Sequence, residues 1–512
     1  MKNTYIIVTL LFWGLVSCND SFLDRGPKDQ LTDESYWSTV EDVEMYTTSV
    51  YTYLLDPVNY ILMTDGYTDN AVPVHIYDAQ GAISSGTATS TTRYFGETWK
   101  NQFQGIRRCN VFLENIERVD MNENRKQIFI GEVKFLRAFF YTTLVRLFGG
   151  VPILTKPLEL NEAIPARDSE QDVYDFIVKD LDEAAQLLPL KRTEQTEIGR
   201  ATKGAALSLK TCISTYFNKY DVAARTAKEV MDLGVYGLFD NYEKLFLPED
   251  ENNQEVIFDH QYLENAKDFT EGSLIDQAFG PQTSSGWEAL SPTQDLVDDY
   301  LCTDGKPIGE SPLYNPMKPY ENRDPRLAYT VLWEDAIFVG KPYKPMTGSA
   351  NATRTGYNFR KYINPKNDGC TKPGWTNFIY MRYAEILLSY AEAQNEISGP
   401  DQSVYDAVNQ IRQRPSVDMP PLTRGLTKEQ MREVIRHEKR IEFAFEGIRL
   451  LDTRHWRITE DVVKKPVYGA MKDGKHIFVE QRNFNPEKDY LWAIPLTEIN
   501  LSKGVLVQNP GY

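Results

Sequence analysis

The chain has 512 residues, of which 41% are apolar and 25% charged, and this is the composition of a folded globular protein rather than a disordered one. Its 73 acidic and 56 basic side chains give a net charge of −17, which repels phosphate backbones and argues against nucleic acid as a partner. Aromatic residues make up 12%, a surplus that favours flat or sugar-like ligands, although a large core would use the same residues.

The first 17 residues have the pattern of an export signal. Lys2 supplies a positive start, and the apolar stretch 5–16 that follows is too short to span a bilayer comfortably. Residues 15–18 read LVSC, which resembles the lipobox of bacterial lipoproteins, where cleavage leaves an acylated cysteine at the new N-terminus. We therefore expect a signal peptide at 1–17 and lipid attachment at Cys18, where several acyl chains would anchor the protein durably. A plain secretory signal with an incidental cysteine is the alternative.

Helical periodicity dominates the rest of the chain. The clearest case is 124–148, where apolar residues recur every three or four positions and Gly149-Gly150 ends the pattern. Arg137 and Arg146 interrupt this stretch, and no other stretch after residue 18 is more apolar, so we expect no membrane span there. Further helices are expected at 41–55, 97–119, 170–188, 200–217, 221–233, 378–396, 403–414 and 428–446, with a short turn at 240–246.

Two stretches resemble repeats of one helical unit. Residues 204–233 and 383–414 each contain two helical patterns joined by a short turn, with alanines where the helices would approach closely, so we interpret them as tetratricopeptide-like (TPR-like) pairs. Two long segments, 60–96 and 265–377, lack this periodicity and are rich in turn-forming residues and aromatics. Loops of this length in compact proteins are usually functional. Cys109 falls in a helical pattern and is interpreted as an apolar filler.

The common sequence motifs of catalysis are absent. The chain contains no GxSxG, HExxH, GxxxxGK[ST] or strand-linked GxGxxG motif, and its five histidines never pair at metal-ligand spacing. Residues 65–70 resemble a calcium loop in composition but lack the EF-hand order of ligands. We therefore expect no metal, no cofactor and a binding protein rather than an enzyme. Glycoside hydrolysis stays open, because two carboxylates a few ångströms apart leave no local signature.

The densest cluster of charged residues lies at 436–456. Within it, Glu438, Glu442 and Arg449 recur at spacings that place them on successive helical turns. We interpret them as structural, tying this helix to its neighbours through charge-assisted hydrogen bonds, rather than as an active site.

The same segment carries a resemblance to a known family. Together with four other motifs it resembles the SusD/RagB family, which comprises surface glycan-binding lipoproteins of Bacteroidetes, and the resemblance covers nearly the whole mature chain. One departure is Ala493, where the family often has proline. The motifs are Glu442, Glu446-Gly447, Arg449, Asp452, Arg454 and Trp456; Glu132–Ala138 with Leu147–Pro152; Arg382–Glu385; Leu491–Pro495; and the closing Gln508–Tyr512.

The resemblance implies a mainly α fold, in which TPR-like helix pairs form a scaffold and inserted loops pack against it. We accordingly expect a lipid-anchored segment at 18–40, an N-terminal half at 41–264, and a C-terminal half with a loop-rich insert at 265–512. The resemblance also implies a partner, a SusC-like TonB-dependent transporter in the outer membrane, to which the protein would deliver oligosaccharide at the cell surface. A lipid-anchored glycoside hydrolase and a peptide-binding import lipoprotein are the alternatives.

Candidate ligand contacts come from the two loop segments. Trp287 is flanked by small residues and has no periodic partner, so it is available to stack on a sugar ring. In the first loop, the segment ending in Asp69 resembles the family segment just before a sugar-stacking aromatic, and His75 and Tyr77 follow it. Four other tryptophans lie in or beside helical patterns and are expected in the core: Trp37, Trp99, Trp456 and Trp492.

Overall fold

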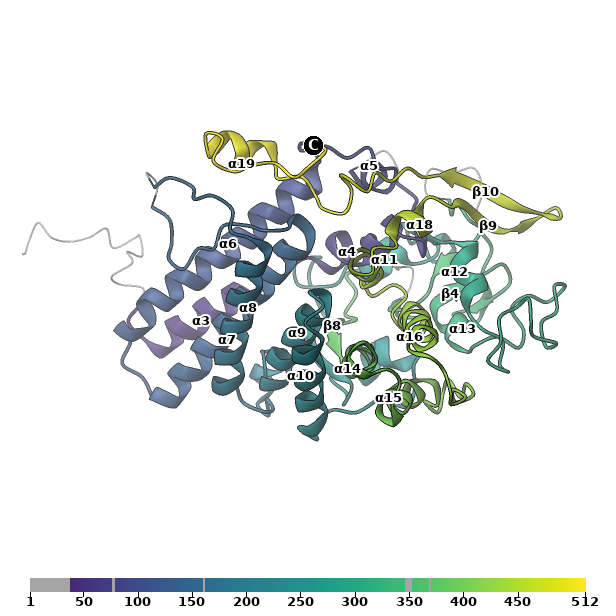
Figure 1. Ribbon diagram of the computed structural model, residues 1–512, viewed down its shortest axis with the longest axis horizontal. Coiled ribbons are helices and arrows are strands. Elements are labelled where there is room, and N and C mark those ends of the chain that lie inside the picture. Colours follow the sequence, from purple (N-terminus) through teal and green to yellow (C-terminus); the bar gives the residue numbers. More distant parts are fainter. Residues whose placement is uncertain (1–36, 76–78, 160–161, 346–351, 368–369) are drawn as a thin grey trace, which may run out of the picture.

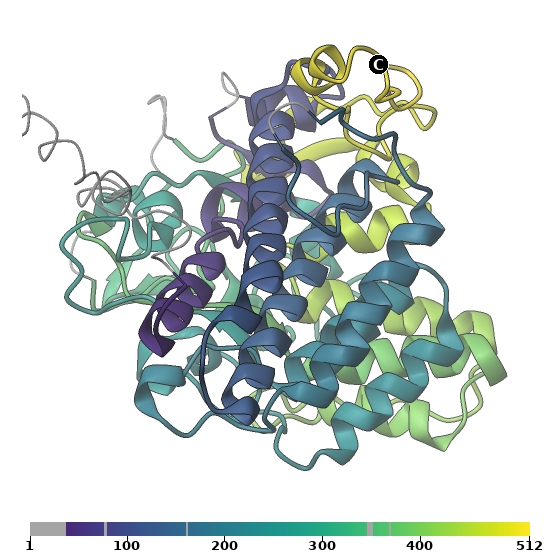
Figure 2. The same ribbon diagram turned by 90° about the vertical axis from the view of Figure 1, so that its left-hand side faces the viewer.

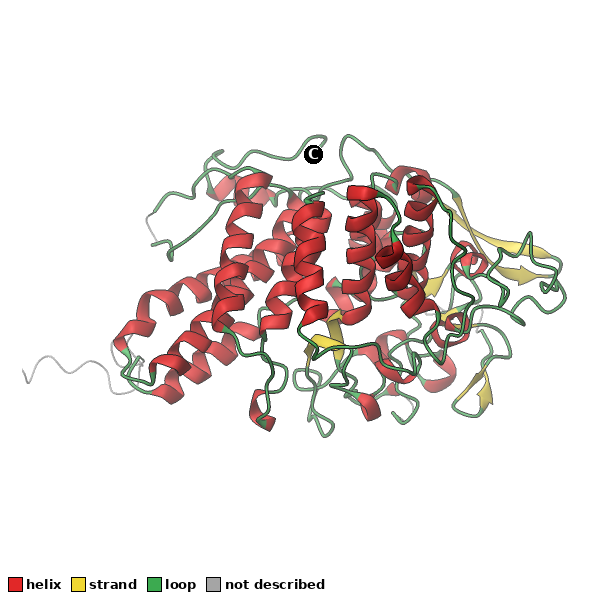
Figure 3. Cartoon of the chain, turned by 60° about the horizontal axis from the view of Figure 1, so that its bottom comes forward, coloured by secondary structure: helices red, strands yellow, loops and turns green. Residues whose placement is uncertain are grey.

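The computed structural model describes residues 37–75, 79–159, 162–345, 352–367 and 370–512. Its long helices stand side by side in a row, while the strands and most loops gather beside and below that row (Figures 1 and 3). Turned by 90°, the first helices of the chain are seen to run past one another as long neighbouring rods (Figure 2). The fold is mainly α, as the sequence predicts.

Nine helices of eleven or more residues form this row and its neighbours within the described part of the chain. They are α3 (Val40–Tyr51), α6 (Arg93–Asn115), α7 (Glu123–Phe148), α8 (Glu170–Leu187), α9 (Lys203–Tyr216), α10 (Tyr220–Asp232), α14 (Tyr383–Ser398), α15 (Gln402–Arg412) and α16 (Lys428–Glu442). Shorter helices are α4 (Pro57–Tyr60), α5 (Ala79–Ser84), α11 (Ile275–Phe279), α12 (Gln294–Asp299), α13 (Arg326–Thr330), α17 (Arg449–His455), α18 (Thr459–Val463) and α19 (Leu496–Leu501).

Six of the nine long helices begin at a residue whose side chain accepts a hydrogen bond from an amide of the first turn. The Asn122 side chain caps α7 by accepting from the Arg125 amide, and Gly149 ends the helix at φ 77°, a conformation that glycine adopts without a steric cost. Capping boxes open α3 at Thr39 and α16 at Thr427. The predicted helices coincide with observed ones to within a few residues, apart from the one predicted over 378–396.

The first five residues of that predicted helix form a strand instead. Strand β8 (Phe378–Arg382) pairs antiparallel with β2 (Val256–His260), and only then does α14 begin. A short, buried apolar run has the same composition in a strand and in a helix, so periodicity alone could not separate them. Four of the five β8 residues are buried and only Tyr380 is half-buried, so the strand packs on both of its faces.

The other strands are short and come in pairs from distant parts of the chain. β1 (Ala71–Pro73) pairs with β3 (Leu290–Pro292), and β4 (Val331–Leu332) pairs with β7 (Asn358–Phe359). Two hairpins complete the set of described strands: β5 (Ile337–Phe338) with β6 (Lys341–Pro342), and β9 (Pro466–Lys472) with β10 (Lys475–Gln481).

Two large apolar cores hold these elements together. One lies between α3, α6, α7, α8 and α9, and the other lies under the loop-rich part and reaches α16. The pairs α9–α10 and α14–α15 pack as consecutive helices, with Ala223, Ala224 and Ala393 at the contact between α10 and α14. The tryptophans expected in the core (37, 99, 456 and 492) are all buried, and so is Cys109. Within the described residues, no helix is both long and apolar enough to cross a membrane.

A buried network of charges ties α16 to the strands and loops around it. The Glu442 carboxylate accepts hydrogen bonds from three buried arginines, Arg326, Arg382 and Arg414, at 2.8–2.9 Å. These guanidinium groups hold the pKa of Glu442 well below its usual range. Removing one partner from such a network leaves a buried charge uncompensated, at a cost of about 3–5 kcal/mol. The structural interpretation is therefore confirmed for Glu438 and Glu442, which lie on α16 and pair with arginines of neighbouring elements. Arg449 instead begins the separate helix α17, where it binds Asp69.

Candidate functional site

The two loop segments singled out in the sequence meet through the β1–β3 ladder. In this ladder Pro73 lies opposite Leu290, and one step further the amide of Val74 donates to the carbonyl oxygen of Ala289 at 3.0 Å. The chain leading to His75 therefore runs beside the chain coming from Trp287, although more than 200 residues separate them. Tyr77 lies outside the described residues.

A rigid backbone presents Trp287 at the surface, where 39% of the residue is exposed. Its amide donates to the carbonyl oxygen of Gln277 at 2.8 Å, and a Cβ on Gly286 would lie 2.1 Å from the Gly280 oxygen, so only glycine fits there. The next residue, Glu288, is buried and accepts a hydrogen bond from the Tyr343 hydroxyl at 2.9 Å. These contacts fix the loop on both sides of the ring.

Asp69 is directed away from the surface. Its carboxylate accepts two hydrogen bonds from Arg449, at 2.9 and 2.7 Å, and forms an ion pair with Arg440 at 3.1 Å. The two guanidinium groups hold the pKa of Asp69 well below its usual range, despite its burial. Both oxygens of the carboxylate are bound by arginine, so Asp69 has a structural role: it joins the first loop to the C-terminal segment. It is not retained among the ligand contacts.

A surface groove that the sequence did not point to lies near the other end of α11. It has a volume of about 480 Å³, and a second hollow of about 350 Å³ continues it past Thr52, Leu54 and His260. Pockets that bind small ligands typically fall within roughly 300–1,000 Å³. The helix α11 links this groove to Trp287: Leu274, just before the helix, lines the groove, and the carbonyl oxygen of Gln277, near the end of the helix, accepts the hydrogen bond from the Trp287 amide. With five residues, α11 spans only about 8 Å.

Aromatic rings and polar side chains alternate around this hollow, which we call the aromatic groove. His260 and Tyr262 are stacked, with ring centroids 4.6 Å apart, and 39% of Phe269 is exposed. The Tyr60 hydroxyl donates to the Glu97 carboxylate at 2.6 Å. The polar side chains of the lining are Thr52, Asp56, Glu97, Lys100, Asn101, Gln104 and Thr270. A sugar ring has an apolar face and a rim of hydroxyl groups. Aromatic rings can stack on that face, and amide and carboxylate side chains can form hydrogen bonds with the hydroxyls, so this lining suits a sugar.

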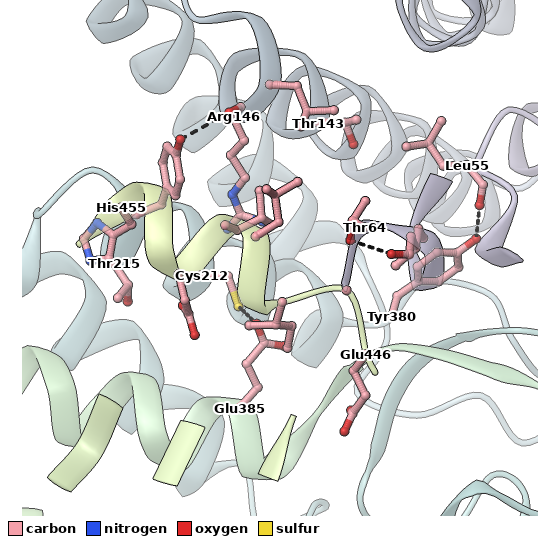
Figure 4. Close-up of a pocket in the computed structure, with 18 of the residues that line it drawn as sticks. Leu55, Thr64, Thr143, Arg146, Cys212, Thr215, Tyr380, Glu385, Glu446 and His455 are labelled. Carbon is pink, nitrogen blue, oxygen red and sulfur yellow. Dashed lines mark hydrogen bonds between the residues drawn. The ribbon is translucent and has the colours of Figure 1, made fainter. Parts of the chain in front are cut away.

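Tyr380 holds the two walls of the aromatic groove together from behind. Its hydroxyl donates to the carbonyl oxygen of Leu55 at 3.0 Å (Figure 4). The same hydroxyl oxygen lies 3.2 Å from Nδ1 of His260. Because the hydroxyl proton is directed to Leu55, Nδ1–H of His260 donates to the hydroxyl oxygen. Burial lowers the pKa of His260, which keeps the imidazole neutral at pH 7.

An interior pocket of about 160 Å³ lies behind this wall, and Leu55 and Tyr60 line both cavities. Its lining combines apolar side chains with charged and polar ones, among them Arg146, Glu385, Glu446 and His455 (Figure 4). There the Cys212 thiol donates to Glu385 at 3.2 Å, and burial raises the pKa of both groups. Within the described residues, no three His, Cys, Asp or Glu side chains gather as a metal site.

Comparisons with known proteins identify the family of the chain. A sequence model described as the SusD family matches residues 254–512, and one described as starch-binding and associating with the outer membrane matches residues 21–213. The chain belongs to the SusD family. The resemblance seen in its C-terminal motifs is thereby confirmed.

Solved structures of SusD-family proteins have the same fold. A SusD-like carbohydrate-binding protein from Bacteroides fragilis superposes with a TM-score of 0.85 and 31% identity, covering 91% of this chain and 99% of the other. A second SusD-like protein from Bacteroides fragilis has a TM-score of 0.83 and 32% identity, covering 95% of this chain and all of the other. SusD-like protein P25 of Formosa agariphila is 25% identical over all of this chain and 99% of its own length.

Sequence reasoning missed the aromatic groove of this SusD-family protein for an identifiable reason. Tyr60 and Phe269 lie in the two loop segments, but each is a single aromatic among many, and His260 and Tyr262 lie at and just beyond the end of a strand. The alternation of ring and polar side chains arises only when the α3–α4 connection, the start of α6 and the segment 260–274 come together. No local signal in the chain could have indicated that assembly.

Proposed function

We propose that this protein captures oligosaccharides at the cell surface and delivers them to a TonB-dependent transporter of the outer membrane. The observation that carries the proposal is the aromatic groove, with the exposed Trp287 about one short helix away. Carbohydrate binding by relatives supports it: one structural relative is described as a carbohydrate-binding protein, and a curated relative that is 23% identical is the starch-binding protein SusD of Bacteroides thetaiotaomicron.

We place the sugar rings along the groove and towards Trp287. The stacked pair of His260 and Tyr262 offers one ring face, Phe269 a second and Trp287 a third. Each ring gives about 0.5–1.5 kcal/mol beyond the apolar area it covers, so several together can hold a flexible chain. His75, which follows β1 where the chain runs beside the segment from Trp287, is retained as a candidate contact. Tyr77 is retained on the sequence argument alone.

The proposed location follows from the N-terminal signal and the family. The matched family model is described as associating with the outer membrane, and this supports a protein held there. We propose that acylation of Cys18 supplies the anchor, with cleavage after residue 17. The protein would then present the groove to the medium while the transporter sits beneath it.

A glycan panel tests the proposal. Mature protein is titrated calorimetrically with neutral and acidic oligosaccharides and with a peptide pool, and reducing ends are assayed after prolonged incubation. We expect at least one oligosaccharide to bind with no release of reducing ends. Turnover would identify a glycoside hydrolase, and binding of peptides alone would identify a peptide-import protein; either result contradicts the proposal.

A further inference from the structure

The β9–β10 hairpin projects from the end of the molecule opposite α3 (Figure 1). Its first strand is fixed to the body beyond its midpoint: the amide of Ala470 donates to the carbonyl oxygen of Thr355 at 2.7 Å, and a Cβ on Gly469 would lie 2.2 Å from that oxygen. Glu480, near the end of β10, is held by Arg354 and Arg482. What the outer part of the hairpin exposes is therefore a fixed feature of the fold.

Large apolar side chains on this hairpin face water. Tyr468 is 43% exposed, Met471 62% and Phe478 60%. Tyr468 and Phe478 lie opposite each other in the ladder, with ring centroids 5.9 Å apart in an edge-to-face arrangement. A two-stranded hairpin is only marginally stable by itself and would gain stability if its rings packed on the rest of the protein. Rings that stay exposed to water therefore indicate a surface for contact with another molecule.

The hairpin is also basic, on a chain whose net charge is −17. Lys472 and Lys475 lie directly opposite each other, a like-charge pair that costs stability, and Lys464 and Lys465 are exposed at the base. Among the described residues, none of these four ammonium groups has an ion-pair partner. Lysines on an edge strand can also serve to discourage strand pairing between molecules. Exposed aromatic rings favour such association, so protection against strand pairing does not explain why the hairpin carries both lysines and exposed rings.

We propose that the β9–β10 hairpin is an accessory binding site for an anionic polysaccharide. The Tyr468 and Phe478 rings stack on sugar faces, and the opposed lysines pair with carboxylate or sulfate groups spaced along the polymer. An acidic protein surface fits the hairpin less well, because lysine is depleted from protein interfaces, whereas the hairpin and the two residues before it expose four lysines. This site is separate from the aromatic groove and binds a polymer independently of it.

The test uses polygalacturonate as the probe, with neutral dextran and polyglutamate of similar length as controls, on the intact mature protein. We expect polygalacturonate to bind more weakly as salt rises, dextran not to bind, and polyglutamate to bind less tightly because it offers no ring to stack. Phe478→Ala should weaken polygalacturonate binding about tenfold with an unchanged melting temperature, since the ring is exposed.

Charge variants complete the test. Lys472→Gln combined with Lys475→Gln should weaken binding and flatten its salt dependence, whereas Lys179→Gln combined with Lys228→Gln, exposed lysines on α8 and α10, should change neither. Trp287→Ala should leave polygalacturonate binding intact. The proposal is overturned if polygalacturonate does not bind, if polyglutamate binds equally and Phe478→Ala has no effect, or if only Trp287→Ala abolishes binding.

Discussion

The hydroxyl of Tyr380 lies 3.0 Å from the carbonyl oxygen of Leu55, and this bond joins a central strand to the connection between α3 and α4. The same hydroxyl lies 3.2 Å from Nδ1 of His260, on the opposite wall of the aromatic groove. One buried oxygen therefore sets the width of the groove. The Tyr380 ring itself is held by stacking on Phe258, with centroids 5.6 Å apart.

Removing only this oxygen should loosen the groove. In Tyr380→Phe the ring packing is kept, but the Leu55 carbonyl and the His260 N–H lose their partner, which costs about 1–3 kcal/mol of stability. We expect glycan affinity to fall roughly threefold to tenfold, because part of the binding energy is then used to order the walls. Calorimetric titration and urea unfolding measure the two effects.

A matched variant separates the positioning effect from a general loss of stability. Tyr174→Phe removes a buried hydroxyl that pairs with Ser214 at 3.0 Å, between α8 and α9 and away from the groove. It should lower stability without changing affinity. Equal affinities for the parent and Tyr380→Phe would show that the hydroxyl does not position the groove.

Trp287→Ala should act on binding and not on folding. We expect an affinity loss of about tenfold for a glycan that the parent binds, because one stacking ring and its apolar area are removed. The melting temperature should hardly change, whereas Trp492→Ala, which empties a core site, should cost about 3–5 kcal/mol. A large drop in the melting temperature of Trp287→Ala, or an unchanged affinity, would remove Trp287 from the site.

Glu442→Gln should destabilise the protein by about 3–5 kcal/mol at pH 7, because three buried arginines each lose one of the carboxylates that compensate their charge. The folded-state pKa of Glu442 lies below its usual value, so its contribution is complete above about pH 4.5 and is lost as the pH falls. Urea unfolding between pH 3 and 7 should therefore show the two proteins converging in acid. A constant difference at every pH would contradict the network's charge dependence.

Glu251 should produce the opposite pH dependence. Burial and the nearby Asp259 raise the pKa of Glu251 to about 7 in the folded protein, so between about pH 4.5 and 7 the folded state keeps a proton that the unfolded state has lost. Stability from this residue falls as the pH rises through that window. Glu251→Gln should be more stable than the parent above pH 7 and equal to it below pH 4.5. The control is Glu249→Gln, because the Glu249 carboxylate pairs with Lys366 and its pKa is lowered. This variant should gain no stability above pH 7, and a gain there would contradict the assignment of the pH dependence to Glu251.

Cys18→Ala should give a folded protein that leaves the membrane fraction, since the proposed acyl chains would have no attachment point. The measurement is cell fractionation followed by immunoblotting, in cells that lack the partner transporter. A variant that stays with the membranes would show that something other than Cys18 holds the protein there.

The helical part of the fold could be predicted because its signals are local. In α7 the spacing of apolar residues marks the buried face, and the glycine after Phe148 marks the end. The tryptophans with periodic neighbours, such as Trp456 and Trp492, were placed correctly in the core for the same reason. The strand β8 was missed because its pairing partner, β2, lies over 100 residues away.

The candidate site depends on contacts that no local pattern records. The exposure of Trp287 could be predicted because its flanking small residues leave it without a packing partner in the sequence, while its contact with a ligand stays a prediction. Asp69 was assigned by resemblance to ligand contact, yet its real partner, Arg449, lies 380 residues further along. The boundary proposed at 264–265 stays a prediction, although two strand pairs, β2 with β8 and β1 with β3, join the two sides of it.

A crystal structure of the mature protein soaked with an oligosaccharide from the glycan panel tests the account most directly. We predict sugar density in the aromatic groove, with one ring stacked on Tyr262 or Phe269 and the chain extending towards Trp287. Density for the oligosaccharide only at another face of the molecule, with the aromatic groove empty, would contradict the account.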